Sequence, residues 1–280
     1  MIKSRITAAI WPWGTTTREQ METAARAISE IGYESFESVK QAIYAYDLDV
    51  KAYREVLDRY NIKPVSFYFH LPQKGMEAEV FGTLDKELEF VAELGVKRLC
   101  LQATIYRPKD DNGNVVEMNE GHLAWQLDLM GQFAEKTLQY GIMTNLHPHK
   151  NTWVMYENEI DNIFMNLDSN LIKFAPDTAH LVTGNCDPYK VMKKYADRIN
   201  FTHFKDIKTL DAKSAGLATG GMEVYSNFLE LGQGSVDFRS IFDLLKETGY
   251  DGPLCEELDR APVSNEESAR NNFKYILENY

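Results

Sequence analysis

The sequence predicts an α/β protein, a (β/α)8 TIM barrel formed by residues 1–280 as one domain. Three observations carry this prediction. Short apolar runs alternate with amphipathic segments of helical period, which is the pattern of βα units on a parallel sheet. Several amphipathic segments end in a glycine directly before the next apolar run, as helices with a left-handed C-terminal cap do. The pattern repeats eight times, which favours a closed barrel over an open, doubly wound sheet.

The predicted strands are short apolar runs of a length typical of buried strands. They fall at residues 6–10, 35–39, 64–69, 96–102, 143–147, 172–175, 199–203 and 253–257. The predicted helices lie near 18–31, 49–60, 76–94, 120–140, 157–167, 187–195, 237–248 and 266–278. Capping glycines are expected at Gly32, Gly95, Gly141 and Gly249.

The longest segment without clear periodicity runs from about residue 206 to residue 235 and contains "GLATGG" and "LGQGS". Loops this long inside a compact domain are usually functional or mobile. In a barrel we expect this segment to lie over the mouth as a lid.

Composition excludes several classes of protein. The formal net charge is -12, whereas a nucleic-acid binder usually carries a basic face, so no nucleic-acid partner is expected. The three cysteines form no C-x-x-C pair and are odd in number, which argues against a disulfide framework. No apolar run reaches the length of a membrane-spanning helix. We therefore expect a cytoplasmic protein with no membrane partner.

Polar residues gather at the carboxyl ends of the predicted strands. Five of the six histidines lie there, namely His70, His147, His149, His180 and His203. The carboxylates there are Glu37, Asp177, Asp206, Glu256, Glu257 and Asp259. Barrel enzymes place their chemistry at this end. Imidazoles and carboxylates converging on one cavity predict a divalent metal site, which Lys205 and Asp206 would help to orient.

Four motifs make the resemblance to a family specific: "PDTAH" (176–180), "HFKD" (203–206), "LGQGSVDF" (231–238) and "GYDGPLCEELDR" (249–260). With these motifs together and in this order, the chain resembles the sugar phosphate isomerase/epimerase superfamily, the xylose-isomerase-like TIM barrels. These motifs cover the C-terminal half densely, whereas the N-terminal half matches mainly in "EIGYESFE".

The resemblance implies one divalent metal, with manganese as the first choice and cobalt, zinc, magnesium or iron as alternatives. The family's ligands are typically Glu, Asp, His and Glu from strands five to eight. Here the last three fall on Asp177, His203 and Glu257, with Glu256 as the alternative to Glu257 if the register shifts by one. At strand five this sequence departs from the family, because His147 stands where a glutamate is usual.

The "HPH" motif at 147–149 resembles the inosose dehydratase branch, which eliminates water from a keto-cyclitol. The C-glycoside-cleaving enzymes, which break a 3-keto sugar by a related elimination, are similar. In such a reaction a base removes the proton beside a ketone, and the resulting enolate expels the β-substituent. The resemblance therefore implies a lyase. Histidine suits proton transfer near neutral pH, so we expect His147 to serve at the metal and His149 to be the catalytic base or acid, or the two to exchange these roles. His180 is expected to contact substrate or move a proton.

Further residues at strand ends are expected to bind the substrate, a small sugar or cyclitol. They are Trp13 (with Trp11 beside it), Glu37, His70, Gln102 and Lys205. Tryptophan suits the apolar face of a sugar ring, and the others offer hydrogen bonds to hydroxyl groups. By analogy with similar barrels we also expect a homo-oligomer.

Other functions fit the sequence less well. A sugar isomerase or epimerase would share the metal site, but the residue at strand five favours the lyase. An AP-endonuclease relative would share the barrel, but the acidic charge opposes DNA binding. A non-enzymatic sugar sensor would not need the set of Asp177, His203 and Glu257.

Overall fold

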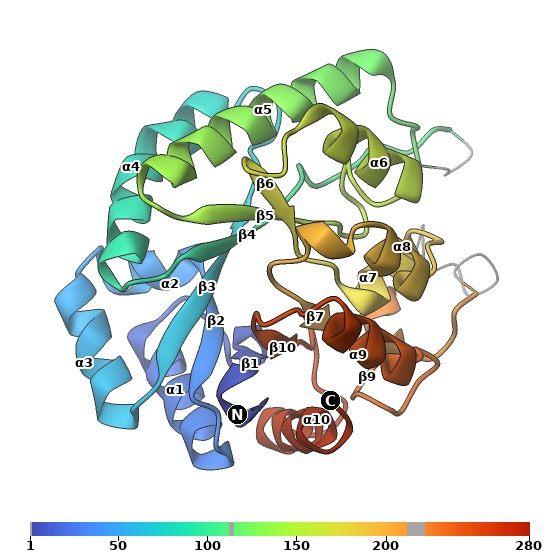
Figure 1. Cartoon of the computed structure of the whole chain (residues 1–280). Helices are drawn as coiled ribbons and strands as arrows, with labels where there is room; N and C mark the ends of the chain where they lie inside the picture. Colours follow the sequence, from blue (N-terminus) through green and yellow to red (C-terminus); the bar gives the residue numbers. More distant parts are fainter. Residues whose placement is uncertain (1, 112–114, 212–221) are drawn as a thin grey trace.

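Eight parallel strands form the barrel (Figure 1). The computed structural model describes residues 2–111, 115–211 and 222–280. The strands, in chain order, are β1 (Ile6–Ala9), β2 (Ser35–Val39), β3 (Lys63–His70), β4 (Arg98–Gln102), β5 (Met143–His147), β6 (Ile172–Phe174), β7 (His203–Phe204) and β10 (Leu254–Glu256). They pair in the order β6-β5-β4-β3-β2-β1-β10-β7. Parallel bridges from Phe174 to Ile199 and from Asp177 to His203 join the two ends of the sheet, so the predicted barrel is confirmed.

Helices surround the strands as an outer layer (Figure 1). They are α1 (Arg18–Ile31), α2 (Lys40–Ala45), α3 (Val50–Tyr60), α4 (Glu77–Glu93), α5 (Glu120–Gln139), α6 (Glu157–Asn166), α7 (Thr178–Thr183), α8 (Pro188–Lys194), α9 (Phe238–Glu247) and α10 (Asn265–Asn279). Each predicted helix is present. The sequence did not predict α2 and α7, because six residues are too few to show a helical period.

Local sequence explains where the helices begin and end. Thr17 and Gln20 form a capping box at the start of α1, in which each side chain accepts a hydrogen bond from the backbone N–H of the other residue. The four glycines expected to cap helices all have positive φ, which a residue with a Cβ rarely adopts: Gly32 (116°), Gly95 (78°), Gly141 (69°) and Gly249 (70°). These caps turn the chain from the helix layer back into the next strand.

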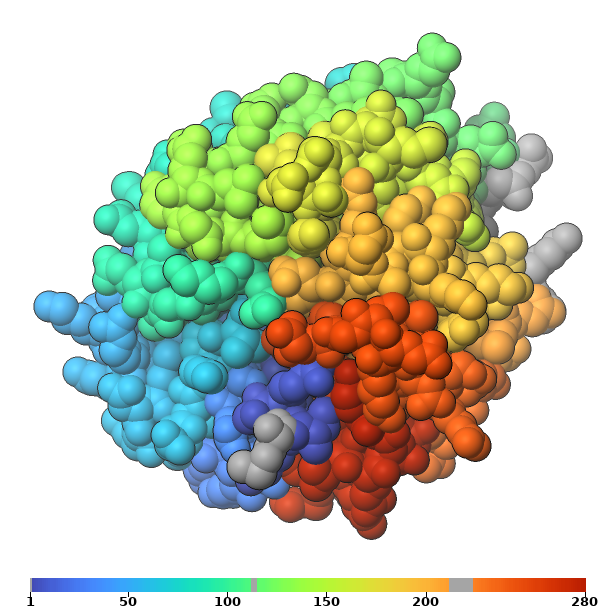
Figure 2. All heavy atoms as spheres, viewed as in Figure 1, coloured from blue at the N-terminus to red at the C-terminus, as the bar shows by residue number. Residues whose placement is uncertain are grey.

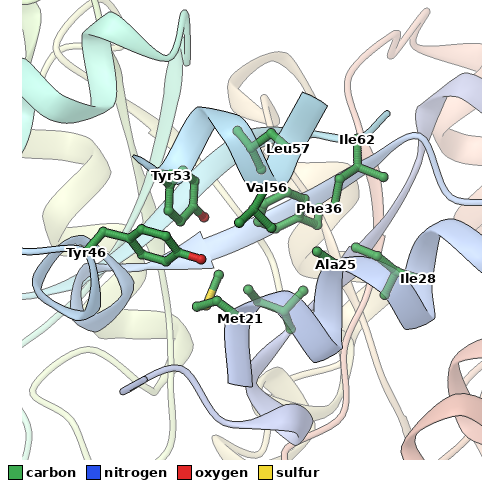
Figure 3. Close-up of a pocket in the computed structure, with 10 residues that line it drawn as sticks. Met21, Ala25, Ile28, Phe36, Tyr46, Tyr53, Val56, Leu57 and Ile62 are labelled. Atoms are coloured by element: carbon green, nitrogen blue, oxygen red, sulfur yellow. The ribbon is translucent and has the colours of Figure 1, made fainter. Parts of the chain in front are cut away.

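The hydrophobic core fills the space between the strands and the helices. Figure 2 shows the face where the first residues of the chain lie, and there side chains cover the strands. A small apolar cavity of ≈ 10 Å³ lies between α1, β2 and α3, lined among others by Met21, Phe36, Tyr53 and Val56 (Figure 3). A cavity of this size holds at most about one water molecule. It is therefore a packing void and not a substrate site.

The segment expected as a lid is only partly irregular. Its residues 212–221 lie outside the described residues. The rest contains an antiparallel pair, β8 (Asp206–Ile207) with β9 (Phe228–Leu229), and the 3-10 helix η4 (Met222–Asn227). The carboxylate of Asp206 accepts hydrogen bonds from the backbone N–H groups of Gly232, Gly234 and Val236 at 2.8–3.0 Å. Asp206 thus anchors the "LGQGSV" loop instead of orienting a metal ligand.

Candidate metal centre

Four side chains converge at the carboxyl ends of the strands. His147 ends β5, Asp177 follows β6, His203 begins β7 and Glu257 directly follows β10. All four are buried, and one ligand atom from each lies within 4.8 Å of the others. Nδ1 of His203 is 2.9 Å from Nδ1 of His147 and 3.3 Å from Oε2 of Glu257. The structure therefore brings together the whole ligand set expected from the sequence.

The chemistry of this cluster fits a divalent cation. Asp177 Oδ2, Glu257 Oε2 and His147 Nε2 are buried without a hydrogen-bond partner, although buried polar atoms normally have one. The carboxylates of Asp177, Glu257 and Asp259 gather around one ammonium group, and burying unbalanced charge is unfavourable. Two imidazoles and two carboxylates are a donor set that Zn²⁺, Mn²⁺, Co²⁺ and Fe²⁺ accept.

The two consecutive glutamates after β10 point to opposite sides, as strand alternation requires. Glu257 faces the ligand cluster. Glu256 faces the helix layer, where the Tyr33 hydroxyl donates to it at 3.1 Å and Asn272 Nδ2 at 2.8 Å. Burial raises the pKa of Glu256 to about 8. The sequence left the register open, and the structure places Glu257, not Glu256, in the candidate ligand cluster.

The ammonium group in the cluster belongs to Lys205, which the sequence suggested as a substrate contact. Its Nζ lies 2.6 Å from Glu257 Oε1, 2.6 Å from Asp259 Oδ2 and 3.3 Å from His180 Nε2. An ammonium has three protons to donate, so these partners account for all of them. Burial opposes its charge, but the neighbouring carboxylates raise the pKa of Lys205 well above its usual value. The structure thus places Lys205 as a counter-ion that holds the ligands in position.

Glu37 is also placed differently from the substrate contact that was expected. It is fully buried, its Oε2 pairs with Nε2 of His203, and the Ser66 hydroxyl donates to its Oε1 at 2.6 Å. Burial alone would lower the pKa of His203, but the carboxylates of Glu37 and Glu257 raise it to about 9. Glu37 therefore contacts a ligand of the centre from behind.

His149 and His180 form a second group beside the ligands. Their ring centroids are 3.6 Å apart. Nδ1 of His149 lies 2.8 Å from the carbonyl oxygen of Lys150, which can only accept, so this nitrogen carries the hydrogen and Nε2 is left to accept. Lys205 donates to Nε2 of His180, so His180 carries its hydrogen on Nδ1, which is buried and has no partner. One ring thus offers an acceptor and the other a donor.

Neither histidine of this pair is charged. Burial and the charge of Lys205 lower the pKa of His149 to about 3. Burial, His149 and Lys205 hold the pKa of His180 well below its usual value. Both rings are therefore neutral near pH 7.

The aromatic residues around the centre were only partly predicted. Tyr68 packs edge-on against His147 and donates its hydroxyl to Gln102 Oε1 at 2.8 Å, so Gln102 is engaged with a neighbour. Trp11 contacts Tyr68 with ring centroids 5.4 Å apart, whereas Trp13 Nε1 donates to Glu266 of α10 at 3.3 Å. Of the two tryptophans, the structure therefore places Trp11, not Trp13, beside the ligands.

His70 and Tyr68 lie on the same strand, β3, and their rings are neighbours beside the candidate ligands. His70 is partly exposed, and its ring lies 5.2 Å from that of Tyr68. Burial and the charge of Lys40 lower the pKa of His70 to about 4, so the ring is neutral. Ser66, Tyr68 and His70 alternate along β3 and share its inner face. That alternation in "KPVSFYFH" was the available signal for Tyr68.

The comparisons with known proteins agree with this geometry. A family model described as "Xylose isomerase-like TIM barrel" matches residues 25–279, and the chain belongs to this family. An inosose dehydratase of Lacticaseibacillus casei (strain BL23) is 27% identical over 305 residues, covering 99% of this chain and 95% of that protein.

Solved structures show the same fold at lower identity. The IolI protein with a bound zinc atom has a TM-score of 0.75 at 16% identity, covering 98% of this chain and 97% of that one. An L-ribulose 3-epimerase has a TM-score of 0.78 at 16% identity, covering 99% of this chain and 94% of that one. At this identity these structures support the fold alone.

Proposed function

We propose that this chain is a divalent-metal-dependent lyase that removes a β-substituent from a keto-sugar or keto-cyclitol, as an inosose dehydratase does. The observation that carries the proposal is the juxtaposition of two groups. His147, Asp177, His203 and Glu257 form a buried donor cluster, and the neutral pair His149 and His180 lies directly beside it. Cleavage of a 3-keto-glycoside by the same elimination is a variant of this proposal.

The donor cluster supplies the electrostatic part of the reaction. These four residues would hold a divalent cation, which would stabilise the negative charge that develops on a ketone oxygen when the neighbouring C–H is deprotonated. Lys205 keeps Glu257 and Asp259 in place and contributes a fixed positive charge. We propose Mn²⁺ as the first ion to test, with Co²⁺, Zn²⁺, Mg²⁺ and Fe²⁺ as alternatives.

The histidine pair supplies the proton-handling part. His149 presents its Nε2 lone pair, so it is the group we assign to take the proton beside the ketone. His180 presents Nδ1–H, which we assign to donate a hydrogen bond to a substrate hydroxyl. Because the two ring centroids are 3.6 Å apart, we assign both groups to neighbouring atoms of one substrate.

Two further considerations favour elimination over epimerisation. Related epimerases use two glutamates as bases, one on each face of the sugar carbon. Here His147 stands in place of the glutamate at strand five. The inosose dehydratases that this chain resembles match over almost the whole length of both proteins. A sugar isomerase or epimerase stays the second candidate, because it would use the same donor cluster.

Location and assembly remain predictions. Among the described residues, no helix combines the length and the apolar character needed to cross a membrane. We propose a cytoplasmic enzyme and a homo-oligomer, to be tested by fractionation and by light scattering.

The test uses a panel of substrates. Metal-loaded protein is incubated with scyllo-inosose, a 3-keto-glucoside, fructose and tagatose, and products are followed by mass spectrometry. The proposal predicts loss of one water or release of an aglycone, and it predicts that H149Q abolishes turnover while metal content is retained. H122Q is the matched control, because His122 on α5 packs against Trp153 and belongs to none of the candidate ligand groups. A product of unchanged mass and altered configuration would establish the epimerase instead.

A further inference from the structure

We infer that Glu37 is a positioning residue for the metal centre: it holds the His203 ring so that Nδ1 faces the cation, and Ser66 in turn holds Glu37. This inference rests on the metal centre of the proposed function and extends it to two residues that provide no ligand atom. Glu37 was expected to touch substrate, whereas the structure buries it completely behind a ligand.

The two nitrogens of the His203 ring face different partners. Nε2 pairs with the Glu37 carboxylate, which can only accept, so Nε2 carries a hydrogen. The other nitrogen, Nδ1, would give up its hydrogen to bind a cation, and it points into the donor cluster, 2.9 Å from His147 Nδ1 and 3.3 Å from Glu257 Oε2. A carboxylate behind a metal-binding imidazole fixes its tautomer and raises its basicity.

The second step concerns what holds Glu37. Its Oε1 accepts a hydrogen bond of 2.6 Å from the Ser66 hydroxyl on the adjacent strand β3. Both side chains are fully buried, so water does not compete for these bonds. A series of hydrogen bonds therefore links Ser66, Glu37 and His203 across the barrel interior, from β3 through β2 to β7. It connects the N-terminal strands, which supply no ligand, to the ligand set.

The molecule contains a matched control for this inference. Glu256 is also buried and also accepts two hydrogen bonds, but from Tyr33 and Asn272 in the helix layer. A Glu→Gln change at either position replaces a buried, hydrogen-bonded carboxyl group with an amide. Only the change at Glu37 removes a partner of a ligand.

The experiment compares wild type, E37Q, S66A and E256Q. Co²⁺ affinity is measured by chelator competition, and the imidazole N–H proton signals of the Zn²⁺-loaded proteins are recorded by NMR. E37Q is expected to lose roughly 10- to 100-fold in affinity and to lose one strongly downfield N–H signal. S66A, which leaves the carboxylate in place, is expected to lose less, and E256Q should keep both the affinity and the signal.

The outcomes separate the possible failures. A merely structural role for Glu37 would lower the unfolding free energy of metal-free E37Q while affinity and the N–H signal stay as in wild type, and this result overturns the inference. If E37Q does not fold, S66A decides, because wild-type affinity and signal in S66A overturn it equally. If wild type itself binds no Co²⁺, the proposed metal centre fails, and the inference fails with it.

Discussion

Glu256 and Glu257 are neighbours in the chain and differ in almost every physical respect. Glu257 lies beside Lys205 and His203, and the charges of these two neighbours lower the pKa of its carboxyl to about 2 against the effect of burial. Its Oε2 has no hydrogen-bond partner. Glu256 has a partner for each oxygen, and burial raises the pKa of its carboxyl to about 8. A single step along the strand separates a charged group from a neutral one.

A missing hydrogen-bond partner, and not burial, distinguishes the carboxylate in the candidate site from the one in the core. Burial is common to both glutamates, so burial alone says nothing about function. Glu256 is satisfied by its surroundings, as buried polar groups in a stable core usually are. Glu257 belongs to a cluster whose buried donor atoms lack partners unless a cation binds there. Trp11 and Trp13 repeat the contrast, because one faces the ligands and the other bonds to α10.

The largest effect is expected from removing the unsatisfied member of the pair. E257A deletes a ligand and leaves Lys205 with fewer partners. Loss of metal-supplied charge stabilisation is worth several kcal/mol, so turnover should fall by roughly 10³-fold or more. The measurement is metal content by elemental analysis together with the rate of product formation. Wild-type metal content and rate in E257A would remove Glu257 from the ligand set.

A second prediction tests a buried ion pair outside the donor cluster. Arg107 Nη1 lies 2.6 Å from Glu159 Oε1, and both side chains are buried. R107M leaves the Glu159 carboxylate buried without its counter-ion, which should cost about 3–5 kcal/mol of unfolding free energy in urea denaturation. The double variant R107M/E159Q should recover part of this loss. Metal affinity should not change in either variant, since neither residue contacts a ligand. A change in affinity would show that the two clusters are coupled.

The third prediction uses the neutral member of the glutamate pair. The folded carboxyl of Glu256 keeps its proton up to about pH 8, whereas a carboxyl in the unfolded chain loses it near pH 4.5. Between these values the native state binds more protons, so this group makes the unfolding free energy fall as pH rises. E256Q cannot titrate and should flatten that fall. Denaturation of wild type and E256Q at several pH values, both metal-free, checks this. Identical slopes would mean that Glu256 is ionised in the fold.

The smallest effect is expected for the tryptophans. If Trp11 contacts the ring of the substrate, W11A should weaken substrate binding by about 0.5–1.5 kcal/mol, which appears mainly as a higher KM. W13F loses only the bond to Glu266 and should leave kcat and KM unchanged. Steady-state kinetics of both variants decides. A higher KM in W13F together with an unchanged KM in W11A would place Trp13, and not Trp11, at the substrate.

The sequence was informative about the barrel and the ligands for a physical reason. Glycine caps and apolar runs mark where each strand lies, and a barrel gathers the carboxyl ends of all strands at one face. His147, Asp177, His203 and Glu257 follow from that placement and from the family resemblance. Pattern does not reveal whether a polar side chain already has a partner. Glu37 and Lys205 were therefore expected at the substrate, although three-dimensional neighbours engage them.

The most direct test of the central claim is the dependence of elimination on one bound ion. Chelated, metal-free wild type is titrated with Mn²⁺, Co²⁺ and Zn²⁺ in the presence of scyllo-inosose, and ion content and dehydrated product are measured together. We predict that dehydrated product appears only as the protein binds one ion per chain. We also predict that E257A neither binds the ion nor forms product. Full dehydration by the metal-free protein would contradict it.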